Sequence, residues 1–440
     1  MKRTGVVICN YNKKEDVIKC IQSVLESDTD DMDIFVVDNA STDASCDAIR
    51  EHFADRVTLL VNKENLGGSG GFNTGIRHAM KHGYEYIWCL DNDTLVDEHA
   101  LSELVKCLDT HADIGMVGSR VYHMSAPDFV QQNGITVDYD NFCVEARYFN
   151  YLEDGTLPEL VYSDAVAACS VLVRRSLIEQ IGPLPEENFL YWDDTEWGVL
   201  CNNAGFKVAT CGTSHILHAY GAKREAVNTF PTYYSYRNQI RFFMMNTPED
   251  KLFSMTCELL TSIFNVLYEG MFREEPNKGK TVMFAFDDAI HNVTGKAPDK
   301  YYLDMEHTYR ELDKLIETNT SFIIITNGYD DLAQDITTKI QKSRPDASIE
   351  HFGDEQLFLE KYNDLNADRS NGIIVLNLCY SIFEVKDSRL KYAYVDLHEN
   401  VFRSDEDLFY VANYGHSLGV FLLSHQPLFM DKTKELRVNL

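Results

Sequence analysis

Two acidic residues, Asp91 and Asp93, lie one residue apart at the end of the apolar run YIWCL (86–90). Where a strand ends in a loop, two carboxylates with this spacing can face the same cavity. Carboxylate oxygens suit Mg²⁺ or Mn²⁺, and these ions usually complete their coordination with substrate phosphates. The same residues could instead cap the following helix, because aspartate is favoured at helix N-termini. The motif alone therefore leaves two interpretations, a metal site and a helix cap.

A second stretch, NLGGSGGFNTG (65–75), places five glycines between an apolar run and a helical pattern. Glycine lowers stability there unless something must come close to the backbone. Backbone N–H groups in such a stretch, together with the positive end of the following helix, can bind an anion. The stretch is not a Walker loop, because no Gly-Lys-Ser/Thr follows it. The alternative is a flexible turn that binds nothing.

A third candidate is YWDDTEWG (191–198), in which two adjacent aspartates, Asp193 and Asp194, lie between two tryptophans. A carboxylate beside bulky apolar groups is partly desolvated, which raises its basicity and suits it to general-base catalysis. The rings of Trp192 and Trp197 offer flat faces for a sugar ring. Here too a helix cap is the alternative.

His218 follows an apolar pair late in the same region. Histidine is a common metal ligand, but a lone histidine is more often structural. We expect His218 to be a ligand only if the fold brings it to Asp91 and Asp93.

The elements that must position these residues alternate along the first hundred residues. Hydrophobic patterning predicts strands at 5–9, 34–38, 57–61 and 86–90, separated by helices at 13–26, 40–53 and 71–82. This alternation predicts an α/β fold with a mostly parallel central sheet and helices on both faces. Ligands of such sheets bind at the carboxyl ends of the strands, which is where Asn10, Tyr11 and Asp38 lie in the sequence.

The patterning predicts three segments. Residues 1–245 carry all of the candidates above and form the expected catalytic domain. Residues 246–318 are expected to form a helical segment and connector. From residue 319 the alternation of strands and helices restarts, so residues 319–440 are expected to form a small α/β domain that serves docking, oligomerisation or acceptor positioning.

The formal net charge of −29 over 440 residues argues against a nucleic-acid partner, which requires a basic face. An anionic substrate would need a local cation, and a metal ion could supply it. Residues 1–4 lead directly into a strand-like run, and apolar runs of about 18 residues are missing, so we expect neither a signal peptide nor a membrane span. The eleven cysteines, without CxxC spacing, indicate buried thiols in a reducing cytoplasm.

In this order, the motifs resemble those of the family 2 inverting glycosyltransferases of the GT-A fold. The matching stretches are VVICNYN (6–12), FVVDNASTD (35–43), NLGGSGGFNTG (65–75), CLDNDT (89–94), CSVLVRRSLIEQIGPLPEENFLYWDDTEWG (169–198) and His218. They cover roughly residues 5–240. The resemblance implies that the glycine stretch lies against the pyrophosphate and sugar of a nucleotide-sugar donor.

The resemblance also implies roles for single residues. Asp91 and Asp93 match the family's DxD motif and would hold Mn²⁺ or Mg²⁺ together with His218. Asp194 matches the general base, with Asp193 beside it, and either of the two could be the base. The residues expected to bind the nucleotide-sugar are Asn10, Tyr11, Asp38, Asn65, Gly68, Gly70, Gly71, Phe72, Asn73, Asp91 and Trp192.

Within the family, GGSGGF, WDD and the late histidine together look like the bacterial galactofuranosyltransferases, which use UDP-galactofuranose. Rhamnosyltransferases that use dTDP-rhamnose are the alternative. The implied reaction is inverting transfer of the sugar to a glycan acceptor in capsule or cell-wall polysaccharide synthesis. The expected partners are the nucleotide-sugar, a lipid-linked acceptor, the inner face of the membrane by peripheral contact, and a second copy of the chain. A catalytically degenerate scaffold protein is the alternative of another class, but both acidic motifs and His218 are present together, which speaks against it.

Overall fold

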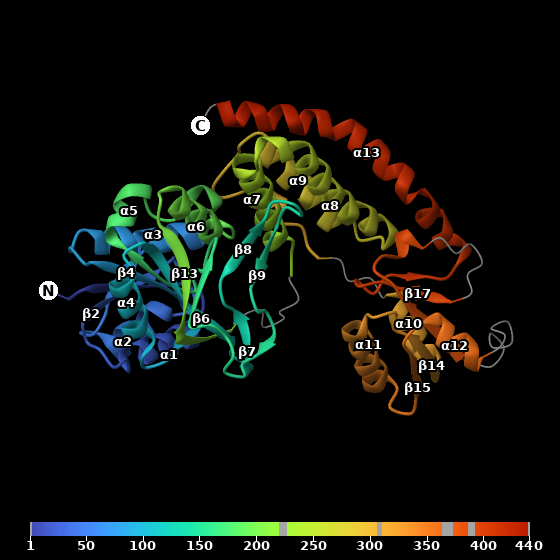
Figure 1. The fold of residues 1–440 in the computed structure, drawn as a ribbon, viewed down its shortest axis with the longest axis horizontal. Helices are drawn as coiled ribbons and strands as arrows, with labels where there is room; N and C mark the ends of the chain where they lie inside the picture. Colours follow the sequence, from blue (N-terminus) through green and yellow to red (C-terminus); the bar gives the residue numbers. More distant parts are fainter. Residues whose placement is uncertain (1, 220–226, 306–309, 363–372, 386–391, 439–440) are drawn as a thin grey trace. The chain divides into compact units, whose positions relative to one another are not determined.

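The computed structural model describes residues 2–219, 227–305, 310–362, 373–385 and 392–438. The chain divides into two compact units. One comprises Met1–Leu259, Thr281–Tyr302 and Phe429–Leu440, and the other Leu260–Lys280 and Leu303–Leu428. The division runs through three helices, α8 (Leu252–Phe272), α9 (Pro276–Ile290) and α13 (Asp405–Val438) (Figure 1). The domain boundaries expected after residues 245 and 318 stay a prediction.

The first unit is built on an eleven-stranded sheet whose centre is parallel. Its central strands are β1 (Thr4–Asn10), β2 (Met32–Asp38), β3 (Thr58–Val61) and β4 (Tyr86–Asp91), in the spatial order β3-β2-β1-β4. Helices cover both faces of these strands, so β1, β2 and β4 are continuous runs of buried apolar residues. The four strands lie where the apolar runs predict them, which confirms the α/β class with a mostly parallel sheet.

Antiparallel strands extend the sheet beyond β4. In spatial order they are β12 (Ser170–Arg174), β6 (Ile114–His123), β7 (Ala126–Gln132) and β10 (Tyr151–Leu152). The long strand β13 (Lys207–His218) runs parallel to β6 and antiparallel to both β5 (Thr94–Val96) and β11 (Leu160–Ser163). A separate hairpin joins β8 (Ile135–Asp138) to β9 (Cys143–Ala146).

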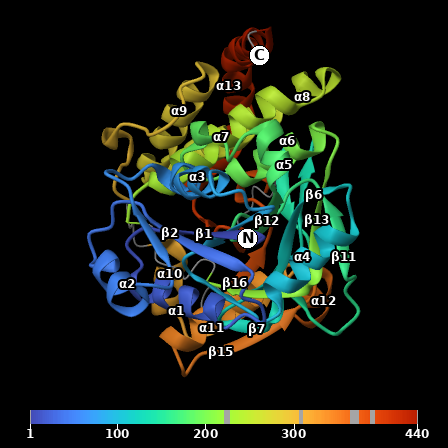
Figure 2. The same cartoon turned by 90° about the vertical axis from the view of Figure 1, so that its left-hand side faces the viewer.

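Helices cover both faces of the sheet (Figures 1 and 2). On one face lie α1 (Lys14–Leu25), α2 (Ser45–Phe53) and α4 (Ala100–Thr110), and on the other α3 (Gly67–Met80), α5 (Arg175–Ile181) and α6 (Asp193–Asn203). α1, for example, buries an apolar stripe at helical spacing that includes Val17, Ile21 and Val24. Residues 230–290 add α7 (Phe230–Asn246), α8 and α9. In the described parts of the chain, every helix is too short or too polar to cross a bilayer.

The helix predicted at 71–82 begins at Gly67, so most of the glycine stretch is helical. The reason is local capping. The Gly67 amide donates to Asn65 Oδ1 at 2.8 Å, and the Leu66 amide donates to Asn39 Oδ1 at 3.1 Å. These side-chain oxygens satisfy amides that a helix start leaves without partners, and so offset the low helix propensity of glycine.

The second unit contains a five-stranded sheet in the order β15 (Ser348–Phe352), β14 (Ser321–Ile325), β16 (Ile373–Leu378), β17 (Ala393–Val395) and β18 (Val401–Phe402). All neighbours pair in parallel except β17 and β18. The helices α10 (Glu311–Thr318), α11 (Asp330–Ser343) and α12 (Glu355–Lys361) accompany it. A small C-terminal α/β region is thus confirmed.

We expect Gly75→Ala to destabilise the protein by about 1–3 kcal/mol, because a Cβ there would lie 2.3 Å from Val7 Cγ1 and 3.0 Å from Val37 Cγ2. The matched control is Gly419→Ala in α13, where a Cβ would meet nothing within 4 Å. That substitution should be neutral or stabilise by up to about 1 kcal/mol. Urea unfolding of the two variants tests this, and equal midpoints would contradict the close packing of α3 on the sheet.

Candidate active site

The residues expected to do chemistry gather at the carboxyl edge of the parallel strands. Strand register pairs Asn10 of β1 with Asp38 of β2, and Cys9 of β1 with Asp91 of β4. A chain of hydrogen bonds joins these strand ends: Asn92 Nδ2 donates to Asn10 Oδ1 at 2.7 Å, and Asn10 Nδ2 donates to Asp38 Oδ2 at 3.1 Å. Since Asn10 and Asp38 are fully buried, they hold the strand ends in place.

His218 lies beside the two aspartates because of strand pairing. β13 pairs with β5 so that His218 is opposite Thr94, the residue that follows Asp93. Its Nε2 atom is 3.3 Å from Asp93 Oδ1 and 3.8 Å from Asp91 Oδ2. One ligand atom from each of the three residues lies within 4.8 Å of the others. The fold thus brings His218 to the aspartates, and two carboxylates with one imidazole fit Mn²⁺ or Mg²⁺.

Gln131, which the sequence patterns did not single out, orients this histidine. Its Oε1 atom lies 2.8 Å from His218 Nδ1. Because an amide oxygen can only accept, Nδ1 carries a hydrogen and Nε2 is left to face the aspartates. Gln131 is buried at the end of β7, in a region whose pattern predicts only mixed structure.

The two aspartates differ in pKa. Burial raises the pKa of Asp91 to about 6, against the attraction of His218. Burial also disfavours ionisation of Asp93, but hydrogen bonds and attraction from His218 and Lys13 outweigh it and lower its pKa to about 2. The Lys13 ammonium pairs directly with Asp93 Oδ2. Burial opposes protonation of His218, but the two aspartates overcome it and raise its pKa. Asp93 is therefore the more strongly ionised of the two carboxylates.

Asp193 and Asp194 are the first two residues of α6 and lie at the same edge. Ser69 Oγ, from the glycine stretch, donates to Asp193 Oδ2 at 2.9 Å. Burial raises the pKa of Asp193 to about 7, the charge of Asp194 adds to this, and the Ser69 hydrogen bond opposes it. Burial also raises the pKa of Asp194. A carboxylate whose pKa lies near neutrality is suited to accept a proton.

The two residues that precede β12 link the two acidic motifs. The Ala168 backbone amide donates to the Asp194 carboxylate. The next residue, Cys169, accepts a hydrogen bond from the Asp91 amide at 3.3 Å through its carbonyl oxygen. The glycine stretch, the Asp193–Asp194 pair and the Asp-Asp-His cluster therefore form one constellation.

Five of the residues expected to bind the donor have surface available. Tyr11 is 46% exposed, and Asn65, Gly68, Asp91 and Trp192 are half-buried. The Trp192 ring packs against those of Phe242 and Phe243, with centroids 5.2 and 5.7 Å apart. The expectation that Trp197 offers a face to a sugar is wrong. Its ring is 1% exposed because it lies on the core side of α6, and its Nε1 donates to the Gly182 carbonyl.

Most of the other residues of the glycine stretch are buried and pack against neighbouring parts of the catalytic unit. Phe72 is buried in the core, and the Asn73 amide donates to the Leu184 carbonyl at 2.7 Å. Gly70 is buried in the first turns of α3, and a Cβ at Gly71 would lie 2.4 Å from Cys9 Sγ. At Gly67, with φ +77°, a Cβ would lie 2.0 Å from the Phe189 carbonyl oxygen. Some of the space that these glycines leave is therefore filled by other groups of the protein, such as the Phe189 carbonyl and the Cys9 thiol.

We expect Asp193→Asn to stabilise the fold at pH 8. The folded-state pKa of about 7 exceeds the ordinary value of 3.8, so the folded protein favours the protonated acid and stability falls as pH rises between these values. The gain should be on the order of a few kcal/mol at pH 8 and vanish near pH 4. Thermal unfolding across this pH range measures it, with the exposed Asp97→Asn as control. A gain that persists at pH 4 would contradict the account.

Comparison with known proteins agrees with this geometry. Residues 5–182 match the family described as Glycosyl transferase family 2. The chain is 26% identical over 222 residues to galactofuranosyltransferase GlfT1 of Mycolicibacterium smegmatis, covering 49% of this chain and 70% of that protein. It is 24% identical over 263 residues to galactofuranosyltransferase GlfT2 of the same organism, covering 54% of this chain but only 40% of that protein.

Among solved structures, the mannosyltransferase PcManGT from Pyrobaculum calidifontis, in complex with GDP-Man and Mn²⁺, aligns with a TM-score of 0.40 and 20% identity. The alignment covers 55% of this chain and 63% of that one. Together, the family match and the curated relatives confirm the resemblance stated above. Residues 5–182 are thus similar to the proteins of glycosyl transferase family 2.

Proposed function

We propose that the chain moves a sugar from a nucleotide-sugar to an acceptor hydroxyl of a glycan, with inversion at the anomeric carbon. The observation that carries this proposal is the convergence of the Asp91, Asp93 and His218 cluster with the Asp193–Asp194 pair at one sheet edge. One group can hold a cation for a diphosphate, and the other can accept a proton. Metal-assisted inverting transfer uses both.

In this proposal Asp194 takes the proton of the acceptor hydroxyl as its oxygen attacks the anomeric carbon opposite the diphosphate. Asp193 is the alternative base, held by Ser69. Asp93, His218 and Asp91 would hold Mn²⁺ or Mg²⁺, which when bound would offset the negative charge of the departing diphosphate. Tyr11, Asn65, Gly68 and Trp192 supply the surface for the donor.

We propose UDP-galactofuranose as the donor, since GlfT1 and GlfT2, to which this chain is 26% and 24% identical, are galactofuranosyltransferases. dTDP-rhamnose is the alternative donor. The proposed acceptor is a lipid-linked glycan of a surface polysaccharide, reached by peripheral contact with the inner face of the membrane in the cytoplasm. Residues 319–440 would position that acceptor or join two copies of the chain.

Calorimetry with UDP, dTDP, UDP-galactofuranose and dTDP-rhamnose, with and without Mn²⁺, tests the donor. We expect UDP species to bind only with Mn²⁺, and Asp93→Ala to weaken this binding at least about 100-fold, because it removes the most strongly ionised ligand. The control is Glu98→Ala, which removes an exposed carboxylate outside the cluster.

Each outcome of this titration has a distinct meaning. Preference for dTDP-rhamnose would keep the site and replace the donor. Equal binding by wild type and Asp93→Ala would reject the metal cluster. A wild type that binds none of the nucleotides would reject transfer and favour the scaffold alternative.

The pH dependence of kcat separates the two candidate bases. We expect kcat to fall as pH drops below the pKa of the base. Ser69→Ala removes a hydrogen bond that lowers the pKa of Asp193. If Asp193 is the base, the acid limb of the profile moves to higher pH in this variant. If Asp194 is the base, as we propose, the limb moves little, and a large upward shift would contradict that assignment.

A further inference from the structure

The five residues before the acidic pair, Asn188–Trp192, form a segment that we call the strap. Its backbone takes conformations that L-residues rarely adopt. Phe189 has φ 62° and ψ −50°, and the Leu190 amide donates to the Asn188 carbonyl at 2.7 Å, which closes a three-residue γ-turn. Tyr191 and Trp192 follow with φ of 62° and 67°. The helix that carries the acidic pair begins at the next residue.

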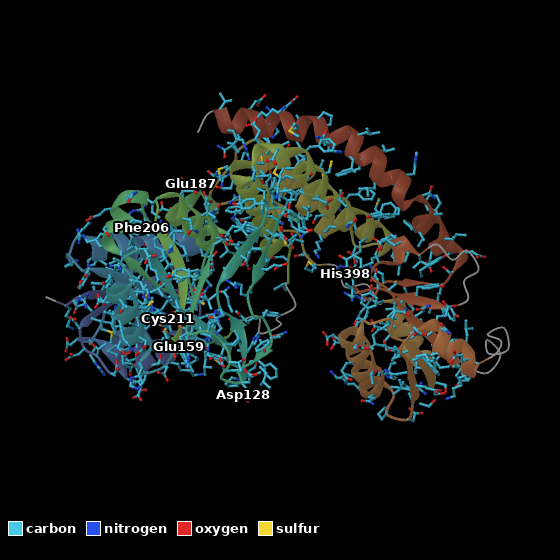
Figure 3. All side chains as sticks on the ribbon, viewed as in Figure 1. Asp128, Glu159, Glu187, Phe206, Cys211 and His398 are labelled. Atoms are coloured by element: carbon cyan, nitrogen blue, oxygen red, sulfur yellow. The ribbon has the colours of Figure 1, made fainter. Side chains whose placement is uncertain are left out.

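Backbone of this kind persists only where its surroundings hold it. On one side the strap lies against the glycine stretch, where the Phe189 carbonyl fills the place of a Cβ on Gly67. The Phe189 ring stacks on Tyr234 of α7, with centroids 5.0 Å apart. Figure 3 labels Glu187, the residue that precedes the strap. The strap therefore lies between α3 and α7.

One side chain, that of Asn238 in α7, contacts three carbonyl groups of the strap. Its Nδ2 atom lies 2.9 Å from the Asn188 carbonyl oxygen, 2.8 Å from that of Leu190 and 3.0 Å from that of Tyr191. Carbonyl groups away from water must find donors, and here three of them converge on one buried amide.

Arg237 keeps this amide in the required orientation. Its Nε donates to Asn238 Oδ1 at 2.9 Å, which leaves the N–H groups of Asn238 for the strap. One guanidinium nitrogen also donates to the Asn188 carbonyl at 2.9 Å. The guanidinium carbon lies 5.4 and 5.0 Å from the ring centroids of Tyr233 and Tyr234, so the arginine is itself fixed.

We infer that Asn238 is a positioning residue for the sugar-transfer reaction. By binding three strap carbonyls it sets where α6 begins, and hence where Asp193 and Asp194 lie. The kinetic consequence rests on the proposed function, whereas the structural consequence does not. A well-placed general base contributes about 10²- to 10⁴-fold to a rate, so displacing the pair lowers kcat. The Asp-Asp-His cluster lies outside the strap, and of the expected donor surface only Trp192 belongs to the strap, so donor affinity should change much less than kcat.

Asn238→Asp tests the inference, because it keeps the size of the side chain and places an acceptor against the carbonyls. We expect kcat to fall about 10- to 100-fold, while the donor KM and the Mn²⁺-dependent nucleotide affinity change by less than about threefold. The matched control is Asn246→Asp on the same helix, since the Asn246 amide donates to the Phe242 carbonyl of its own helix. That variant should keep the wild-type kcat.

Rescue by backbone freedom distinguishes positioning from general loss of structure. Asn238→Asp is combined with Tyr191→Gly and, separately, with Tyr191→Ala. Both double variants lose the half-exposed Tyr191 ring, but only glycine adopts φ 62° without strain. We expect the glycine double variant to have a several-fold higher kcat than the alanine one. Equal kcat values would contradict a role for the strap conformation.

Hydrogen exchange supplies a measurement that needs no activity. Amides of residues 189–195 should exchange faster in Asn238→Asp but not in Asn246→Asp. If the wild type binds no nucleotide, the proposed function is rejected. The exchange rates still show whether Asn238 holds the strap and the start of α6 in place. Unchanged exchange, or a loss of donor affinity as large as the loss of kcat, would overturn the inference. If Asn238→Asp does not fold, the same comparisons are made with Asn238→Ser, whose hydroxyl group keeps one hydrogen-bond donor.

Discussion

Two carboxylates held close together at a buried strand end need a positive charge beside them, and much of the catalytic unit serves this need. Asp91 ends β4 and Asp93 lies in the turn that follows it, and the protein as a whole is strongly acidic. His218 and Lys13 supply the positive charge that lowers the pKa of Asp93. A divalent cation would meet the same need more fully and would also attract a diphosphate. The sheet edge is thus suited to a ligand that brings negative charge together with a metal ion.

Delivery of His218 to that edge depends on strand pairing far along the chain. β13 pairs in parallel with β6 as far as His218, and its last residues also pair with the short strand β5, which directly follows Asp93. The buried amide of Gln131 then fixes which imidazole nitrogen faces the aspartates. On the other side, the glycine stretch admits the Phe189 carbonyl and provides Ser69 for Asp193. The glycine stretch therefore helps to place the acidic pair. It also leaves Gly68 half-buried at the site.

Local patterns predicted the parts of this site that depend on residue type and short range. Continuous apolar runs predicted β1, β2, β3 and β4, and with them the strand ends that carry Asn10, Asp38 and Asp91. The adjacent acids marked Asp193 and Asp194. The start of α3 was missed because its capping oxygens come from Asn39 and Asn65, and Asn39 lies on another loop. Trp197 was misjudged because the core side of α6 becomes clear only when the helix is packed. Lys13, Gln131 and Asn238 belong to no motif, and their roles depend on contacts across the fold.

The most direct test of the central claim is a crystal structure of the protein with Mn²⁺ and UDP. The account predicts one ion bound by Asp93 and by Nε2 of His218, with the diphosphate on that ion and the nucleotide at the strand ends near Tyr11. It also predicts that Asp194 lies across the site from the diphosphate, within reach of an acceptor hydroxyl. An ion or nucleotide bound away from this edge, or His218 bound through Nδ1, would contradict the account.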